Sequence, residues 1–318
     1  MDEFTLIERY FSRHNADASG VALGIGDDAA VVELDPAYQM VIATDTVSSG
    51  THFPPTMSPR AIGHRCLAVN LSDLAAMGAE PLWCTLALSL PSAEVDWLEA
   101  FSAGFFALAD RFGVALIGGD TVRGPLAITV TVHGRVPRGR YVPRSGARPG
   151  DRVFVTGTPG DAAAGLALVD TSSNTPAAEV LRRRFSYPEP RIEAGLALRD
   201  VASAMIDVSD GLLIDLDRLA RASGVGAELD TEFLPVSAQL CEWLGGAAAT
   251  RLALTGGDDY ELCFTVADTA AGGLDEIARD CGCDITPIGR IVAGAGIICL
   301  HNGEPMAIES RGFEHFPG

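Results

Sequence analysis

The sequence contains no lysine, so all 23 residues counted as Lys or Arg are arginine. This absence excludes the mechanisms that depend on a lysine amine, namely Walker-type phosphate loops, protein-kinase active sites, Schiff-base or pyridoxal chemistry and biotin attachment. Any phosphate that the protein handles must therefore contact arginine, backbone N–H groups or metal ions.

Basic charge and long apolar runs are also scarce. The 42 acidic residues give a net charge of −19, and because nucleic acids and anionic membranes attract basic surfaces, we expect neither as a partner. No apolar run of about 18 residues is present, which argues against a membrane span, and the acidic segment 1–11 does not resemble a signal peptide. The seven scattered cysteines do not form a disulfide framework, so we expect a reducing, cytoplasmic location.

The order of strand-like and helix-like segments predicts α/β or α+β layers, and the length suggests about two domains. A stretch rich in Pro, Gly and Arg at 138–150 predicts a linker between domains at 1–137 and 151–318. Five arginines lie between residues 135 and 148, so this stretch is equally compatible with a functional loop.

The clearest single element is an Ala-rich helix, for which Ser58 is the expected N-cap, Pro59 the first residue and Gly78 the stop signal. Apolar runs and alternation predict strands at 39–46, 82–90, 114–117, 126–136, 152–156, 204–207, 259–266 and 285–292. Helical periodicity predicts further helices at 93–112, 161–169, 191–203, 211–222 and 270–280.

Aspartates collect in four short segments that we expect at strand ends or in glycine turns. Any one of them is most simply a surface turn or a helix cap, but four together indicate a site. The segments are Gly24–Asp28, Thr44–Thr46, Gly118–Thr121 and Asp207–Gly211. The similar pieces LIGGDTVRG at 116–124 and LTGGDDYEL at 254–262 reflect either a duplicated turn type or a true repeat.

Asp73 lies inside the Ala-rich helix, with Asn70 one turn earlier on the same face. We expect its carboxylate to be buried and to face a hard cation, because buried carboxylates are rare without a partner. Carboxylate, hydroxyl and carbonyl oxygens suit Mg²⁺ better than Zn²⁺. Because Mg²⁺ usually takes only one or two carboxylates, the number of aspartates predicts several Mg²⁺ ions bridging a polyphosphate.

These segments belong to a longer series of motifs that occurs in one order along nearly the whole chain. The series is ERYF, GIGDDAAVV, TDT, HF, AVNLSDLAAMGAEP, LIGGDTVRGP, RSGARPGD, VTGTPGDAAAGL, DVSDGLLIDL, LTGGDDYELCFT and GFEHF. It resembles the thiamine-monophosphate kinase family, within the larger group that includes aminoimidazole ribonucleotide synthetase. No single motif has to carry the resemblance.

The resemblance implies a two-domain aminoimidazole ribonucleotide synthetase-like fold. Its N-terminal domain would bind ATP and Mg²⁺ and pair its sheet with that of a second copy in a homodimer, and its C-terminal domain would be α/β. The implied activity is transfer of the γ-phosphoryl group of ATP to thiamine monophosphate. The product, thiamine diphosphate, would be made in the last step of its biosynthesis.

The resemblance also assigns roles to individual residues. The implied Mg²⁺ ligands are Asp28, the Ala43 carbonyl, Thr44, Asp45, Asp73, Asp120, Asp207 and Asp210, with Asp27 close by. The implied ATP contacts are Gly119, Asp120, Arg144 and Ser209. The implied thiamine-phosphate contacts are His52, Asp258 and Phe313. The family often has Glu in place of Asp258, and the side chain of Glu is one methylene longer.

The expected mechanism needs no acid, base or nucleophile from the protein. A phosphate monoester oxygen is already anionic near neutral pH, so the acceptor needs little help from a base. Metal ions and positioning would supply the catalysis, and we expect direct in-line transfer without a phosphoenzyme.

Other members of the same group provide the competing hypotheses. Selenophosphate synthetases and hydrogenase-maturation dehydratases use a reactive cysteine near the N-terminus or in the C-terminal tail, whereas the first cysteine here is Cys66 and the chain ends in EHFPG. An ATP-dependent amidine-forming ligase of the same group remains an alternative. So does a catalytically idle, acidic metal-binding scaffold.

Overall fold

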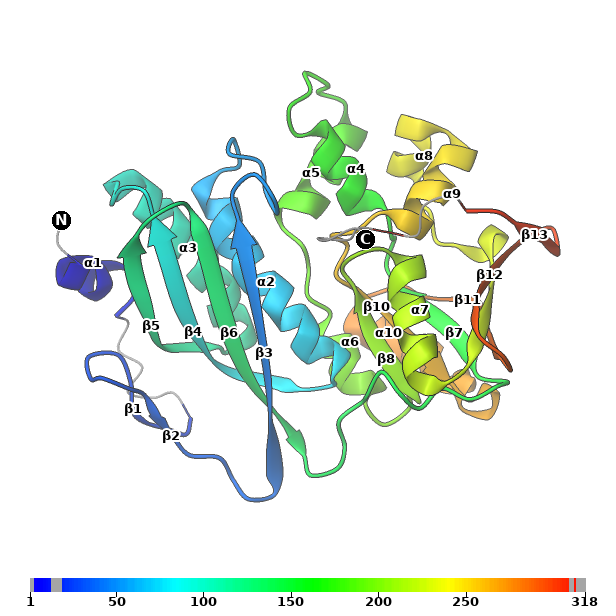
Figure 1. The fold of residues 1–318 in the computed structure, drawn as a ribbon, viewed down its shortest axis with the longest axis horizontal. Coiled ribbons are helices and arrows are strands. Elements are labelled where there is room, and N and C mark those ends of the chain that lie inside the picture. The colour runs from blue at the N-terminus through cyan, green and yellow to red at the C-terminus, as the bar shows by residue number, and fades with distance from the viewer. Residues whose placement is uncertain (1–2, 13–18, 309–311, 313–318) are drawn as a thin grey trace. The chain divides into compact units, whose positions relative to one another are not determined.

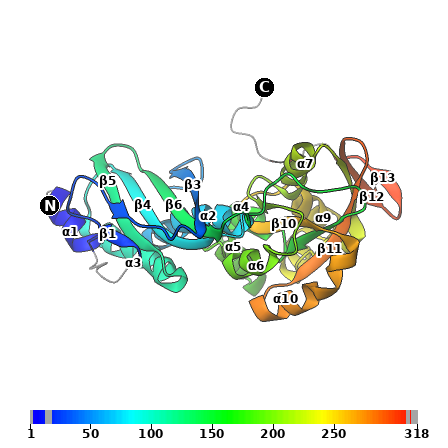
Figure 2. The ribbon, with the colours of Figure 1, turned by 90° about the horizontal axis from the view of Figure 1, so that it is seen from below.

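The computed structural model describes residues 3–12, 19–308 and 312, and the chain divides into two compact units (Figures 1 and 2). The first comprises Met1–Leu74 and Ala79–Gly139, and the second comprises Ala75–Gly78 and Arg140–Gly318. Within the described residues, no helix is both long and apolar enough to cross a membrane.

The first unit is built on a four-stranded sheet in the order β3-β6-β4-β5. Only β4 and β5 are parallel, and helices α2 and α3 cover one face of the sheet (Figure 1). A short helix, α1, and a two-stranded sheet, β1-β2, precede it. The bounds are α1 (Glu3–Tyr10), β1 (Val21–Leu23), β2 (Val31–Val32), β3 (Tyr38–Ser48), α2 (Pro59–Ala76), β4 (Glu80–Leu90), α3 (Val95–Phe112), β5 (Ala115–Arg123) and β6 (Ala127–Pro137).

Alternation along β6 explains why the sheet has one covered face and one open face. Ile128, Val130 and Val132 are fully buried, whereas Thr129 and Thr131 between them are half-buried. The covering helices touch each other through glycine. A Cβ on Gly63 of α2 would lie 2.1 Å from the carbonyl oxygen of Phe101, and one on Gly104 of α3 would lie 1.9 Å from that of Arg60. Only glycine permits this backbone contact.

The second unit contains a seven-stranded sheet in the order β13-β12-β9-β11-β7-β10-β8. All neighbouring strands are antiparallel except β9 and β12. The strands are β7 (Arg152–Thr156), β8 (Ala204–Val208), β9 (Gly226–Asp230), β10 (Glu261–Val266), β11 (Ile285–Val292), β12 (Gly296–His301) and β13 (Glu304–Met306).

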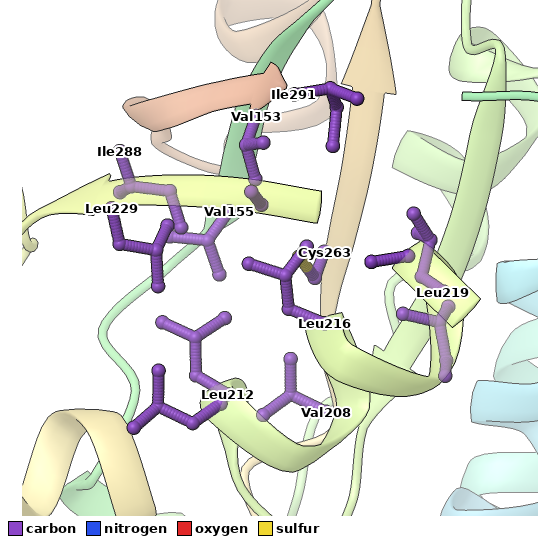
Figure 3. Close-up of a cluster of buried hydrophobic side chains, with 14 of the residues drawn as sticks. Val153, Val155, Val208, Leu212, Leu216, Leu219, Leu229, Cys263, Ile288 and Ile291 are labelled. Carbon is purple, nitrogen blue, oxygen red and sulfur yellow. The ribbon is translucent and has the colours of Figure 1, made fainter. Parts of the chain in front are cut away.

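The helices of this unit include one that packs on the sheet and closes a hydrophobic core. Figure 3 shows Leu212, Leu216 and Leu219 of this helix, α7, gathered with Val155 and Val208 of the strands. The helices are α4 (Asp161–Leu168), α5 (Pro176–Ser186), α6 (Ile192–Leu198), α7 (Leu212–Ser223), α8 (Ala238–Leu244), α9 (Gly246–Thr255) and α10 (Leu274–Cys281), with 3₁₀ turns η1 (Thr231–Phe233) and η2 (Asp268–Gly273). The two layered units confirm the predicted α/β fold class.

Two of the four aspartate segments, which we expected at or just after strand ends, lie within strands that continue beyond their predicted ends. Thr44–Thr46 lies within β3, where hydrogen bonds between threonine hydroxyls continue the pairing with β6. Gly118–Thr121 lies within β5. The predicted strands were therefore too short at these ends. Residues 256–260 form a loop before β10, so the two similar GGD pieces have different local structures and do not form a structural repeat.

Candidate active site

A cavity of about 800 Å³ in the first unit brings together four of the predicted site residues. Asp27 and Asp28 come from the loop between β1 and β2, and Gly119 and Asp120 come from β5. The remaining wall is formed by α1 and the residues after it, and by β4 and β5. Two segments that are about 90 residues apart in the sequence thus share one pocket.

Local backbone geometry explains how β5 delivers Asp120 to this pocket. Cys84 of β4 pairs with Leu116, but the next β4 residue pairs with Gly118, so β5 contains one extra residue. Gly119 follows with φ of +155°, and a Cβ there would lie 1.9 Å from the Leu86 carbonyl oxygen. The bulge and the glycine allow the β5 backbone to approach the neighbouring strand β4 closely. Asp120 comes next and is exposed.

The pocket is lined by four carboxylates, from Glu8, Asp27, Asp28 and Asp120. None of the described residues that line it is Arg, Lys or His. Nowhere in the described part of the chain do three His, Cys, Asp or Glu side chains come close enough to enclose a metal ion by themselves. Sequence reasoning did not single out Glu8, although it opens the ERYF motif.

Asn70 of α2 connects Asp45 of β3 to the helix that also carries Asp73. The Asn70 amide oxygen is fully buried and accepts a hydrogen bond of 2.8 Å from the Asp45 backbone N–H. Asp73 follows one turn later on α2 and is half-buried rather than fully buried as expected. This hydrogen bond joins α2 to the segment of β3 that contains Ala43, Thr44 and Asp45.

His52 lies just beyond β3, where its orientation is fixed from within the same turn. Its Nδ1 accepts a hydrogen bond of 3.1 Å from the Ser48 backbone N–H and lies 3.2 Å from the Ser48 hydroxyl. A ring nitrogen that accepts from a backbone N–H carries no proton, so in the neutral ring the proton is on Nε2.

In the second unit, the loop before β10 meets the end of β8 and the turn that follows it, which brings Asp258 close to Asp207, Ser209 and Asp210. The Asp258 backbone N–H donates to the Ser209 carbonyl at 2.7 Å, and a Cβ on Gly257 would lie 2.6 Å from that same oxygen. Asp258 has φ of +69°, a conformation that non-glycine residues adopt only where their surroundings hold them.

The residues around Asp258 supply that support. The Tyr260 hydroxyl donates to Asp258 Oδ1 at 3.2 Å. Asp259 accepts hydrogen bonds from the backbone N–H groups of Gly160 and Ala162, at 2.6 and 3.1 Å, at the start of α4. Burial raises the pKa of Asp259 well above its ordinary value, although these two hydrogen bonds act in the opposite direction. Sequence reasoning had assigned no role to Asp259 or Tyr260.

Asp210 already has a cationic partner. Arg218 on α7 donates to Asp210 Oδ2 at 2.5 Å and to Asp215 Oδ1 at 2.7 Å. Burial raises the pKa of Asp215, against the hydrogen bond from the Asp210 backbone N–H and the charge of Arg218.

Arg144 is not brought to the same place as Ser209. Its carbonyl accepts a hydrogen bond from the hydroxyl of Ser223, the last residue of α7, whereas Ser209 precedes the first. A helix of 12 residues is about 18 Å long, so the backbone of Arg144 and that of Ser209 lie at opposite ends of α7. Phe313 lies outside the described residues, but a Cβ on its neighbour Gly312 would be 2.6 Å from the Asp210 carbonyl.

Comparison with known proteins gives matches along both units. Residues 26–136 match the family model described as AIR synthase related protein, N-terminal domain, and residues 148–301 match the corresponding C-terminal domain. A thiamine-monophosphate kinase from Salmonella typhimurium is 47% identical over 318 residues, with coverage of 99% of this chain and 98% of the relative.

Solved structures agree with these matches. The crystal structure of a thiamine-monophosphate kinase from Stenotrophomonas maltophilia K279a is 48% identical, with a TM-score of 0.88 and coverage of 96% of this chain and 98% of that one. A structure of AaThiL complexed with AMPPCP and TMP is 35% identical, with a TM-score of 0.80 and coverage of 92% of both chains. The resemblance inferred from the motifs is confirmed: the chain belongs to the thiamine-monophosphate kinase family, within the AIR synthase related proteins.

Proposed function

We propose that this protein is a thiamine-monophosphate kinase that transfers the γ-phosphoryl group of ATP to thiamine monophosphate in a Mg²⁺-dependent reaction. The acceptor phosphate oxygen forms a bond to the γ-phosphorus as the bond to the bridging oxygen breaks, and the products are thiamine diphosphate and ADP. The observation that carries the proposal is the pocket with four carboxylates and, among its described lining residues, no basic side chain, in a chain similar over its full length to kinases of this name.

The donor set fits Mg²⁺. An anionic polyphosphate would be repelled by the pocket carboxylates unless cations lay between them, and Mg²⁺ typically takes one or two carboxylates together with water and phosphate oxygens. When bound, the ions would neutralise phosphate charge and orient the phosphates. We assign the ligand roles to Asp28, Ala43, Thr44, Asp45, Asp73, Asp120, Asp207 and Asp210, with Asp27 beside Asp28.

The chain's own residues would then position the two substrates. Gly119 permits close approach of backbone to phosphate because it has no side chain. Ser209 would supply a hydroxyl to ATP, and Arg144, whose backbone lies at the other end of α7, would reach ATP with its guanidinium. The acceptor phosphate is already anionic near neutral pH, so the chain need not provide a base. We therefore propose direct transfer without a phosphoenzyme.

Three residues are proposed to contact thiamine monophosphate. His52 would donate from Nε2, since its Nδ1 is already an acceptor. Asp258 offers a carboxylate to the cationic substrate, and Tyr260 holds that carboxylate in place. Phe313 would stack on the heteroaromatic rings of the substrate.

The open face of the first sheet supports a homodimer, which we also propose. Ile42 of β3 is 59% exposed, and Met40 on the same strand is also exposed. Exposed aliphatic side chains grouped on a sheet are typical of an interaction surface. A second copy of the chain would cover them. All seven cysteines are free thiols, which fits the cytoplasmic location that we propose.

The test is to incubate the purified protein with ATP, Mg²⁺ and thiamine monophosphate and to measure thiamine diphosphate by chromatography. We expect product with the wild-type protein and almost none with Asp28→Asn. A folded wild-type protein that forms no product would refute the proposal. Stabilisation by ATP with Mg²⁺ in a melting experiment, without product, would point to the amidine-forming ligases, and no stabilisation would point to an idle scaffold.

A further inference from the structure

Asp215 is a buried carboxylate that holds the loop carrying Ser209 and Asp210. It is 1% exposed, although it lies only three residues after the start of α7. Its Oδ2 accepts hydrogen bonds from three consecutive backbone N–H groups, those of Ser209, Asp210 and Gly211, at 3.0, 3.0 and 3.2 Å. One oxygen atom therefore fixes the backbone of the whole turn.

The turn cannot easily be held in another way. The backbone N–H groups before the first turn of a helix have no partner within the helix, so a side chain or solvent must accept from them. Gly211 adopts φ of +130°, and a Cβ there would lie 2.9 Å from the Thr255 carbonyl oxygen. The turn is thus tight on the side of α9, and Asp215 restrains it from the side of α7.

The second oxygen of Asp215 acts on the Asp210 side chain. Asp215 Oδ1 accepts from Arg218 Nη1 at 2.7 Å, and the same nitrogen donates to Asp210 Oδ2 at 2.5 Å. Asp215 thereby controls both the main chain of residue 210 and, through Arg218, the direction of its carboxylate.

We infer that Asp215 is a positioning residue for phosphoryl transfer, which holds Ser209 and Asp210 in the geometry that receives Mg²⁺-bound ATP. This inference rests on the proposed function. Asp215 has no contact with substrate in this role, because both of its oxygens are occupied by the loop and by Arg218. Arg218 balances the charge of Asp210, whose carboxylate would also hold Mg²⁺ in the proposed function.

A carboxylate that merely stabilised α7 could make the same contacts, but its loss would not change the Mg²⁺ requirement or the KM for ATP. Asp217 provides the matched control: it is on the same helix, is 6% exposed and pairs with Arg221 at 2.7 Å. Among the described residues its carboxylate pairs with Arg221, and no hydrogen bond joins it to the 209–211 turn. Loss of either carboxylate removes a buried charge from α7, but only loss of Asp215 releases the turn.

The experiment compares Asp215→Asn with Asp217→Asn. Asn keeps the size of the side chain, but it removes the negative charge that faces three N–H donors and Arg218. We expect Asp215→Asn to raise the Mg²⁺ concentration needed for half-maximal activity and the KM for ATP by about tenfold or more. Asp217→Asn should change both by less than about twofold. Equal effects of the two substitutions would overturn the inference.

Hydrogen–deuterium exchange without ATP or metal gives a readout that does not depend on activity. We expect the backbone N–H groups of residues 209–211 to be protected in the wild-type protein and to exchange about tenfold or more faster in Asp215→Asn, but not in Asp217→Asn. If Asp215→Asn does not fold, the wild-type measurement still decides, because unprotected N–H groups there would refute the inference. A wild-type protein that forms no thiamine diphosphate would instead refute the proposed function.

Discussion

The carboxylate of Glu261 is fully buried at the start of β10 and receives four hydrogen bonds. The donors are Thr156 Oγ1, Arg184 Nη2, Arg191 Nε and Arg191 Nη2, each at 2.6 Å. A Cβ on Gly157 would lie 2.1 Å from Glu261 Oε1, so the surrounding backbone leaves no room for the group to move. We predict that Glu261→Gln strongly destabilises the protein.

The magnitude follows from the ionisation of the carboxylate. Burial alone would raise its pKa, but the charges and hydrogen bonds of Arg191 and Arg184 outweigh burial and lower the pKa from 4.5 to about 2. A difference of about 2.5 pKa units corresponds to about 3 kcal/mol of folding free energy. The cost of breaking a buried ion pair by removing one partner is similar, about 3–5 kcal/mol. Gln removes the charge and leaves both guanidinium groups without it.

The sign of the pH dependence is fixed by the same shift. The folded-state pKa lies below the unfolded value, so the stabilisation is present above about pH 4.5 and is lost as the pH falls toward about 2. The wild-type protein should therefore exceed Glu261→Gln by about 3 kcal/mol at pH 7 and by only about 1 kcal/mol at pH 3.

Urea unfolding followed by circular dichroism measures both differences. Glu228→Gln is the matched control, because Arg290 donates to Glu228 from two nitrogens, at 2.8 and 2.6 Å, on the exposed surface of the same sheet. An exposed pair contributes about 0–1 kcal/mol, so the control should change little. A loss of less than about 1 kcal/mol for Glu261→Gln at pH 7, or a gap that stays constant with pH, would refute the reasoning.

Three further predictions test other parts of the molecule. Gly104→Ala places a Cβ 1.9 Å from the Arg60 carbonyl and should destabilise the protein by about 1–3 kcal/mol, whereas Gly246→Ala, with open space around it, should be nearly neutral; equal melting temperatures would contradict this. Asp120→Asn should leave the fold intact and lower turnover by about a hundredfold or more, and retention of wild-type turnover would remove Asp120 from the site. Ile42→Arg should shift the protein from dimer to monomer in light scattering, and an unchanged dimer would exclude this sheet face as the interface.

The aspartate motifs predicted much of the site because each motif combines glycine with a carboxylate. Gly24–Asp28 is a turn as expected, and it meets Gly119 and Asp120 in one pocket. Helical spacing also placed Asn70 and Asp73 correctly on one face of α2. The spacing of residues within each motif was therefore enough to predict which neighbouring residues lie on the same side of one element.

Contacts that depend on tertiary packing were not predictable. Asp215 reads as an ordinary polar position in an amphipathic helix, and only the fold turns it back toward the 209–211 turn. The strand prediction that ended at Ile117 stopped early because the following glycines are poor strand formers, yet the cross-strand pairing continues through them. The prediction that ended at Thr46 stopped two residues before the end of β3. Nothing in the local sequence shows that Arg144 lies at the far end of α7 from Ser209.

The contacts of Asp258, Asp259 and Glu261 also constrain the length of their loop. Asp259 is directed into the start of α4 and Glu261 toward two arginines, whereas Asp258 is only half-buried and is the carboxylate that we propose for the substrate. Deleting one residue here would turn the half-buried carboxylate of Asp258 into the core and would turn a buried carboxylate, that of Asp259 or Glu261, out of it. Substitution of Asp258 by the longer Glu is tolerable in this arrangement, but an insertion or deletion is not, so we expect relatives to vary in side-chain reach at this position while keeping the loop length unchanged.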